Sequence, residues 1–309
     1  MKLGKLSNDK LDSLILSKFG HMRKEVVCSP HVGVDCAAVD PITAADKNIG
    51  SLTVHVSCND AAAAGAEPIG LLVTLLIPPH GTEEEVERIA SELAEAARLA
   101  NIEIIGGHTE VTASVTRYVT CAAVIARAGK NGIITPAGMK AGQDIIMTKM
   151  AGIEGTAVIA SDAAGRTGLT DAELEEARGF MSMVSVVKEG LYAAEHGATA
   201  MHDITEGGVF GAAWEMAEAS GCGMVLYPEK VLMHPITKKI CQKFGIDPYR
   251  LISSGSMLIA CDDGEGMVKG LAAIGIPAAV IGKAVESGVS TADGTEIPAP
   301  EADELYKII

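Results

Sequence analysis

The sequence predicts a mixed α+β protein with two domains, and three observations lead to this class. The chain has 309 residues, which is enough for two domains of ordinary size. Strand-like and helix-like segments occur in both halves. A charged segment that contains glycines, at residues 126–138, separates the halves. We therefore expect an amino-terminal domain over residues 1–135 and a carboxy-terminal domain over residues 136–309.

The elements of the first half are predicted from apolar periodicity and from capping residues. A short helix is expected at residues 7–18, a strand at residues 49–56, and a helix start in the alanines that follow it. Residues 82–100 form the clearest predicted helix, because Thr82 is followed three positions later by a glutamate, as in a capping box. A long strand at about residues 116–127 is expected to close this half.

The second half shows the same mixture of elements. A helix is predicted at residues 170–181, where Thr170 and Glu173 again form a capping box. Near the end of the chain, a strand at residues 256–262, a helix at about residues 264–273 and a strand at about residues 278–285 form a β-α-β pattern.

Composition excludes several classes of function. The net charge of −15 argues against nonspecific binding of nucleic acid, which needs a positive surface. The longest apolar run, residues 69–77, is far shorter than the roughly 20 residues that span a bilayer. No signal peptide is recognisable, and the seven cysteines form no C-x-x-C pair. We expect a cytoplasmic protein with reduced thiols, and no membrane partner.

The most informative segment is SCNDAAAAGAEP, at residues 57–68. It places Asn59 and Asp60 at the beginning of a run of small residues. In the expected strand-to-helix junction, the carboxylate of Asp60 is placed either to cap the helix or to hold a divalent cation. Alanines and Gly65 keep the backbone bare, so that an anion can come close.

Two further blocks contain acidic residues or glycine pairs near expected strand ends. The segment HVGVDCAAVDPIT carries Asp35 and Asp40, and the segment IIGGHTEVT carries Gly106 and Gly107 directly after apolar residues. Proteins usually hold Mg²⁺ through one or two carboxylates plus substrate phosphates. The three aspartates are therefore candidate Mg²⁺ ligands, although each one alone is equally typical of a turn or a helix cap.

These three blocks, in this order, resemble the ATP-binding superfamily of aminoimidazole ribonucleotide (AIR) synthase, HypE, selenophosphate synthetase and thiamine-monophosphate kinase. Residues 198–224 are similar to the His-Asp-x-Thr-x-Gly-Gly motif and following helix of HypE, and residues 136–160 to the start of the carboxy-terminal domain of the family. The resemblance covers nearly the whole chain. It implies a PurM-like fold, in which an amino-terminal α/β domain pairs into a dimeric β-barrel and is followed by an α+β domain.

The resemblance also implies that the amino-terminal domain binds Mg-ATP near the interface of a homodimer, with Asp35, Asp40 and Asp60 around the metal. Asn59 would donate its amide to a phosphate, and Gly106 and Gly107 would turn backbone N–H groups towards the nucleotide. Thr109 would contact a ligand or the backbone, and Lys5, in a mobile entry segment, would fold over a phosphate. Lys5 is equally consistent with a solvated side chain. His108 stands where several relatives carry an acidic residue, so it is expected to contact a phosphate or the substrate, with Glu110 as the acidic partner.

In the second domain, the start of the helix after the His-Asp-x-Thr motif is expected to bind a phosphate or an anionic group of the substrate through Thr205, Gly207 and Gly208. Alternatively, Asp203 or Thr205 is only the cap of that helix. His202 is either a general acid/base or a hydrogen-bonded structural histidine. The candidate catalytic residues are His108, Glu110, His202 and Asp203.

The function implied is an ATP-dependent enzyme, similar to a phosphotransferase or a ligase. It would use Mg-ATP to phosphorylate an oxygen of an unidentified small substrate, of the amide or carboxylate type. HypE proteins end in a cysteine, whereas this chain ends ELYKII, and Glu206 occupies a position that is often basic in HypE-like sequences. The chain is therefore most similar to the AIR synthase-related, HypE-like group. The alternative is a non-catalytic, ATP-binding maturation or partner protein.

Overall fold

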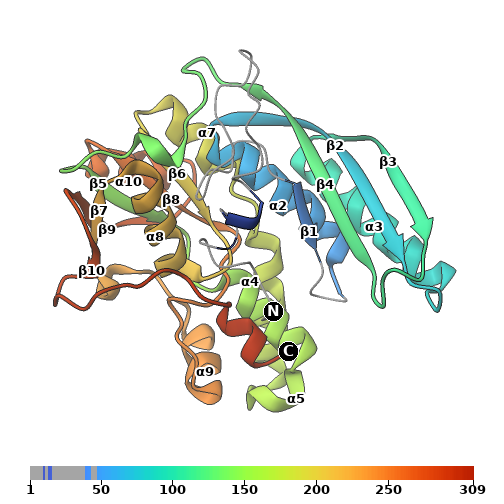
Figure 1. Cartoon of the computed structure of the whole chain (residues 1–309). Coiled ribbons are helices and arrows are strands. Elements are labelled where there is room, and N and C mark those ends of the chain that lie inside the picture. The colour runs from blue at the N-terminus through green and yellow to red at the C-terminus, as the bar shows by residue number, and fades with distance from the viewer. Residues whose placement is uncertain (1–9, 11–12, 16–38, 43–46) are drawn as a thin grey trace.

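The fold is built on two β-sheets with helices packed against them (Figure 1). The computed structural model describes residues 10, 13–15, 39–42 and 47–309. Lys5, Asp35 and most of the helix expected at residues 7–18 lie outside these residues, and so does the side chain of Asp40.

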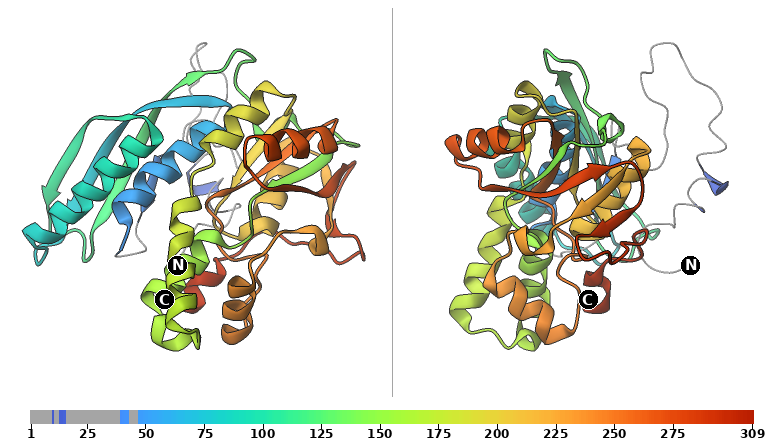
Figure 2. Two further views of the ribbon diagram at one scale, coloured as in Figure 1. Left: turned by 180° about the vertical axis from the view of Figure 1, so that it is seen from behind. Right: turned by 90° about the vertical axis from the view of Figure 1, so that its left-hand side faces the viewer.

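The first sheet has four strands in the order β1-β4-β2-β3, of which β2 and β3 are parallel and the other neighbours antiparallel. The strands are β1 (Val39–Ile42), β2 (Ala66–Ile77), β3 (Glu103–Val111) and β4 (Val119–Ala128). Two helices, α2 (Ile49–Ala63) and α3 (Glu83–Ala100), cover one face, as the view from behind in Figure 2 shows. The sheet forms half of a barrel whose other face carries no helix of the described chain.

Helix α3 confirms the prediction made from the capping box. The side-chain oxygen of Thr82 accepts the N–H of Glu85, and the Glu85 carboxylate accepts the N–H of Thr82. Asn101 ends the helix in the left-handed conformation. The apolar face of α3 packs on α2 and the sheet through Ile89 and Leu93.

The prediction of a strand at residues 49–56 is wrong, because these residues form the first half of α2. Thirteen of the 15 residues of this helix are buried. A helix buried on every side carries no polar face, so its sequence loses the helical period. Its β-branched residues Thr53, Val54 and Val56 then favour a strand in a purely local interpretation.

The second sheet has six strands in the order β10-β7-β9-β5-β8-β6. The strands are β5 (Asp144–Thr148), β6 (Ala200–Ile204), β7 (Gly223–Leu226), β8 (Ser256–Cys261), β9 (Ala278–Val285) and β10 (Val289–Thr291). Helix α8 (Gly208–Ser220) packs on the face that Ile145 and Met147 present. Helices α7 (Val187–Glu195) and α10 (Gly264–Ala273) pack on the face that Ile146 presents. The two faces alternate along β5 because successive strand side chains point in opposite directions.

A separate group of helices packs beside this sheet and around the end of the chain (Figure 1). Its α-helices are α4 (Ile153–Asp162), α5 (Ala164–Thr167), α6 (Asp171–Gly179) and α9 (Pro235–Phe244). The short 3₁₀ helices are η2 (Pro136–Gly138), η3 (Phe180–Met183), η4 (Pro228–Lys230) and η5 (Glu304–Lys307). The capping box of α6 and the β8-α10-β9 succession confirm the predictions for the second half.

Helix α2 joins the two sheets, because its residues belong to three different apolar clusters. Val54 and Cys58 pack in the cluster of the first sheet, whereas Leu52 packs in the cluster of α4, and Ala62 and Ala63 pack in the cluster of α7. None of the helices among the described residues is both long and apolar enough to cross a lipid bilayer.

The glycine pair expected after a strand lies inside β3 instead. Gly107 has φ 147°, and a Cβ atom built on it would lie 1.8 Å from the carbonyl oxygen of Val73 on β2. A Cβ atom on Gly106 would lie no closer than 3.4 Å to another heavy atom, in the side chain of Leu72. Gly107 is therefore required by the close approach of β2 to β3.

We expect Gly107→Ala to lower the free energy of unfolding by about 2 kcal/mol or more, through backbone strain and the clash with Val73. Gly106→Ala, the matched control, should change it by less than about 1 kcal/mol, since its neighbour is the end of a flexible side chain. Thermal and urea unfolding of both variants measure the difference. Equal destabilisation by the two variants would contradict the role given to Gly107.

Candidate functional site

Asp60 lies in the last turn of α2, not at the helix start that the sequence suggested. Its backbone carbonyl accepts the N–H of Ala64, which is the residue that ends the helix. A carboxylate at this end of a helix faces the negative end of the dipole, which is unfavourable. Burial first, and then the charge of Asp60, raise the pKa of the neighbouring Cys58 thiol to about 12. Capping therefore does not explain Asp60.

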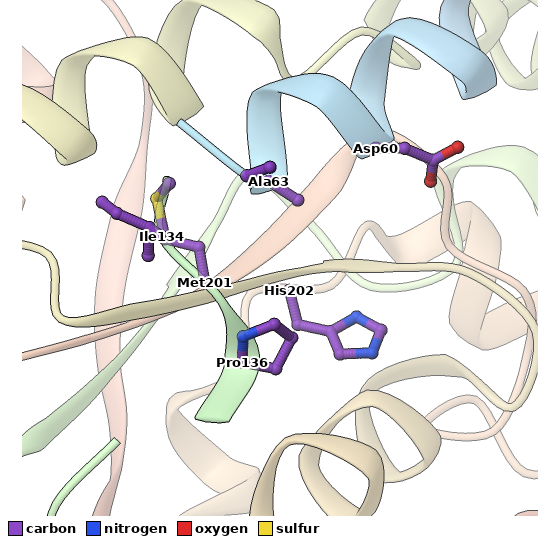
Figure 3. A pocket seen from close by; sticks show the side chains of 7 residues that line it. Asp60, Ala63, Ile134, Pro136, Met201 and His202 are labelled. Atoms are coloured by element: carbon purple, nitrogen blue, oxygen red, sulfur yellow. The ribbon is translucent and has the colours of Figure 1, made fainter. Parts of the chain in front are cut away.

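A small cavity lies between the end of α2 and strand β6 (Figure 3). Its volume is about 10 Å³. Asp60 and Ala63 line it from α2, and Met201 and His202 line it from β6. The remaining lining residues are Ala64, Ile134 and Pro136. The fold thus brings the Asn-Asp block of the first half and the His-Asp block of the second half to one cavity.

His202 is buried and is held by neighbours at both ring nitrogens. Its Nδ1 donates a hydrogen bond to the backbone oxygen of Asp203, at 2.6 Å, because a carbonyl can only accept. Its Nε2 lies 3.3 Å from the carboxylate of Glu215 on α8. Asp203 is buried as well, on the opposite side of the strand. The hydrogen-bonded histidine that the sequence allowed is the arrangement observed, and the same ring lines the cavity.

The amide of Asn59 is hydrogen-bonded within the fold, and its expected contact with phosphate stays a prediction. The side chain is fully buried. Its Nδ2 donates to the backbone oxygen of Val184 at 2.7 Å, and its Oδ1 accepts the N–H of Val186 at 2.8 Å. These two bonds fix the segment before α7 to α2.

The candidate residues of the third block lie on β3, at the edge of the first sheet. His108 and Glu110 are two positions apart and therefore on one face, with His108 Nε2 3.4 Å from Glu110 Oε2. Their side chains are 65% and 54% exposed, and Thr109 is exposed between them. Neither this cavity nor the second one described below is lined by a residue of β3.

The sequence allowed Asp203 or Thr205 as the cap of α8, but neither side chain caps this helix. Gly207 is the N-cap residue, with φ 82°, and no side-chain hydrogen bond caps the start of the helix. The N–H of Gly207 donates instead to Asp303 Oδ2 at 2.7 Å, and the N–H of Gly208 donates to the carbonyl of Thr205 at 3.1 Å. A carboxylate of this chain thus lies where an anionic ligand was expected.

A second cavity, of about 80 Å³, lies beside this helix start. We call it the acidic pocket, because three of its lining side chains are carboxylates. Apolar residues line the rest of it together with one tyrosine. The lining residues are Glu154, Glu206, Asp303, Tyr306, Pro41, Ile42, Ile252 and Leu305.

Burial and neighbouring negative charges raise the pKa of Glu154, Asp303 and Tyr306 in the acidic pocket. Burial, and then the charges of Asp303 and Glu206, raise the pKa of Glu154 to about 7, against the hydrogen bond from Ser254. Burial raises the pKa of Asp303 to about 6, despite the backbone N–H groups bonded to it. Burial and then the charge of Glu206 raise the pKa of Tyr306, whose hydroxyl donates to Glu206 at 2.8 Å.

The sequence interpretation missed Glu154, Asp303 and Tyr306. One signal was available for Glu154, which is the single charged residue in the apolar stretch AGIEGTAVIA, at residues 151–160. Asp303 and Tyr306 carried no such signal, since their role depends on the folding of η5 onto α8. In the described part of the chain, no three His, Cys, Asp or Glu side chains are grouped closely enough to hold a metal ion.

Comparison with known proteins identifies the family. Residues 26–128 match the N-terminal domain of AIR synthase related proteins, and residues 140–294 match the C-terminal domain. The chain belongs to the AIR synthase related family. The division between residues 135 and 136 stays a prediction.

Two relatives illustrate the closeness of the match. The chain is 30% identical over 240 residues to a protein of Methanocaldococcus jannaschii described as a hydrogenase expression/formation protein, covering 77% of this chain and 68% of the relative. It is 33% identical over 264 residues to carbamoyl dehydratase HypE of Rhizobium leguminosarum bv. viciae, covering 81% and 72%.

Solved structures share the two-domain PurM-like fold. Hydrogenase maturation protein HypE in complex with ATP superposes with a TM-score of 0.75 at 20% identity, over 98% of this chain and 94% of that one. The protein AaThiL complexed with AMPPCP and TMP superposes with a TM-score of 0.78 at 17% identity, over 98% and 99%. At these identities the likeness establishes the fold.

The raised pKa of Glu154 leads to a prediction on stability. Because the pKa lies above the ordinary value of 4.5, ionisation of Glu154 destabilises the folded protein progressively as the pH rises towards and through about 7. We expect Glu154→Gln, relative to wild type, to stabilise the protein more at pH 8 than at pH 5, by up to about 3 kcal/mol. Urea unfolding at the two pH values measures this, with exposed Glu218→Gln as the control. A pH-independent difference would refute it.

Proposed function

We propose that the protein is an ATP-dependent enzyme that activates an oxygen of a small substrate, of the amide or carboxylate type, by phosphorylation. Asp60 is the observation that carries this proposal. A buried carboxylate at the negative end of α2 has no capping role, and it shares a cavity with His202 of the motif that resembles HypE. Relatives that share the fold over 98% of the chain were solved with ATP or AMPPCP.

The carboxylate of Asp60 is a type of ligand that Mg²⁺ prefers, although the described residues form no complete set of ligands for the ion. Asp60 supplies one carboxylate, and we propose Asp35 and Asp40 as its companions, consistent with the small number of protein ligands that Mg²⁺ needs. Bound there, the ion would offset the charge of the phosphates. A cavity of about 10 Å³ is far smaller than the roughly 300–1,000 Å³ of ordinary ligand sites, so it would hold one ion and the nucleotide itself would lie outside it.

In the proposed reaction, the substrate oxygen forms a bond to the γ-phosphorus of ATP. The bond from that phosphorus to the β–γ bridging oxygen breaks, and ADP leaves with the electron pair. A carboxylate substrate releases no proton, whereas an amide substrate gives its N–H proton to a base. His108, Glu110, His202 and Asp203 are our candidates for that base.

A non-catalytic ATP-binding partner protein is the second candidate function. It is favoured by Asn59, whose amide is committed to the backbone at Val184 and Val186, and by the distribution of the candidate catalytic residues over β3 and β6. Release of ADP in the presence of a pool of small metabolites distinguishes the two functions. ATP binding without ADP release from any pool would favour the partner protein.

We further propose a homodimer that forms through the open face of the first sheet. Four large aliphatic side chains on this face are more than a third exposed, an unusual density for a solvent-facing sheet. They are Ile69, Leu72, Ile105 and Ile125. A second copy of the half-barrel would cover them. Such a pairing would also bring His108 and Glu110 to an interface, as the resemblance implies.

We expect Asp60→Asn to weaken binding of Mg-ATP by at least about tenfold, because one buried carboxylate next to the proposed ion is lost. Calorimetry with Mg-ATP and with a non-hydrolysable analogue measures the affinity. Asp171→Asn, an exposed aspartate in the first turn of α6, is the matched control and should bind as wild type does. Equal affinity of Asp60→Asn and wild type would remove Asp60 from the site.

We expect Leu72→Asp to convert the dimer to a monomer, since it places a charge in the middle of the proposed interface. The matched control is Leu99→Asp, because Leu99 is equally apolar and 64% exposed but lies on α3. Size-exclusion chromatography with light scattering, at micromolar concentration, reports the mass. A monomeric wild-type protein, or a dimeric Leu72→Asp variant, would contradict the proposed interface.

A further inference from the structure

The acidic pocket has a feature that the proposed ATP chemistry does not use. Glu154, in the first turn of α4, is 8% exposed and lines the cavity. Its Oε2 accepts no hydrogen bond from any described residue. A buried carboxylate oxygen without a donor is costly, and a site for a ligand that supplies the donor is one explanation for it.

The other carboxylate oxygens of the pocket are largely occupied. Asp303 Oδ1 accepts the N–H of Leu305 at 2.8 Å, and its Oδ2 accepts the N–H of Gly207 at 2.7 Å. Glu206 Oε1 accepts the hydroxyl of Tyr306. The oxygens that remain for a ligand are therefore Glu154 Oε2 and the second oxygen of Glu206.

The charge balance of the pocket favours a cation. The charges that act on Glu154 come from Asp303 and Glu206, and the charge that acts on Asp303 comes from Glu206. All of these are negative. Like charges at a buried site repel one another strongly, and a positive group between them would convert the repulsion into attraction.

The geometry favours an organic cation over a metal ion. The described His, Cys, Asp and Glu side chains form no group of three that could hold a metal, and both oxygens of Asp303 already accept N–H groups. Half of the lining is apolar, through Pro41, Ile42, Ile252 and Leu305. An apolar wall opposite carboxylates suits a molecule with a charged end and a hydrocarbon body. The volume of about 80 Å³ restricts the ligand to a small molecule.

We propose that the acidic pocket binds a small molecule with a protonated primary amino group. Glu154 and Glu206 accept hydrogen bonds from the ammonium group, and Tyr306 holds the Glu206 carboxylate in place. The carbon chain of the ligand lies against Ile42, Ile252 and Leu305. This inference does not rest on ATP binding, because the pocket is complete without Asp60.

Binding of n-butylammonium chloride, in the absence of nucleotide, tests the proposal. Calorimetry and saturation-transfer NMR at pH 8 should detect saturable binding to wild type, and n-butanol should bind more weakly because it lacks the charge. Glu154→Gln should weaken the affinity at least about tenfold, since a buried charge partner is lost. Glu218→Gln, an exposed position on α8, removes the same charge outside the pocket and should bind as wild type does.

Several results would overturn the proposal. They are the absence of saturable binding to wild type, equal affinity of Glu154→Gln and wild type, and equal affinity for n-butanol. Stoichiometric displacement of the amine by Mg²⁺ or Ca²⁺ would identify a metal site instead. The thermal transition of Glu154→Gln confirms that the variant is folded, so that lost binding is not lost structure.

The pH dependence supplies an independent check. The titratable groups that face Glu154 are Glu206, Asp303 and Tyr306. Because the pKa of Glu154 is about 7, protons compete with the amine below that pH. The affinity for n-butylammonium should fall by about tenfold between pH 8 and pH 6, as the ionised fraction of Glu154 falls. A constant affinity over this range would contradict the role of Glu154.

Discussion

The burial of α2 between the two sheets is the constraint on which the rest of the structure depends. This helix packs against α3 and the first sheet on one side and against α4 and α7 on the other. The Asn59 amide fixes it to the backbone at Val184 and Val186. Its last turn therefore has one position relative to β6, and this position brings Asp60 to the cavity that His202 lines.

A buried ion pair between Lys149 and Glu189 also anchors the segment before α7. Lys149 Nζ lies 2.6 Å from Glu189 Oε1 on α7 and donates to the carbonyls of Met183 and Gly255. Because the segment before α7 is held by Lys149 as well as by Asn59, movement of α2 away from it would break both hydrogen bonds of the Asn59 amide. These two bonds fix the end of α2 relative to the second sheet.

The acidic pocket, in contrast to this ion pair, brings together negative groups that repel one another. Folding of η5 onto the start of α8 places Asp303 and Tyr306 beside Glu154 and Glu206, and the resulting rise in the pKa of Glu154 measures the cost of this arrangement. Functional sites are where such strained electrostatics are retained. Helix packing through Leu305 and Ile308 supplies the stability that offsets it.

The sequence by itself determined the elements whose signals are local, and the family. The capping boxes of α3 and α6 and the β8-α10-β9 pattern were readable, because their stabilising contacts span a few residues. Only the tertiary structure decided that α2 is a helix, that Gly107 fits against Val73, and that Asp303 meets Gly207. Helix α2 shows the reason. Burial on all sides erases its periodicity, and contacts between segments as far as 127 residues apart leave no pattern in either segment.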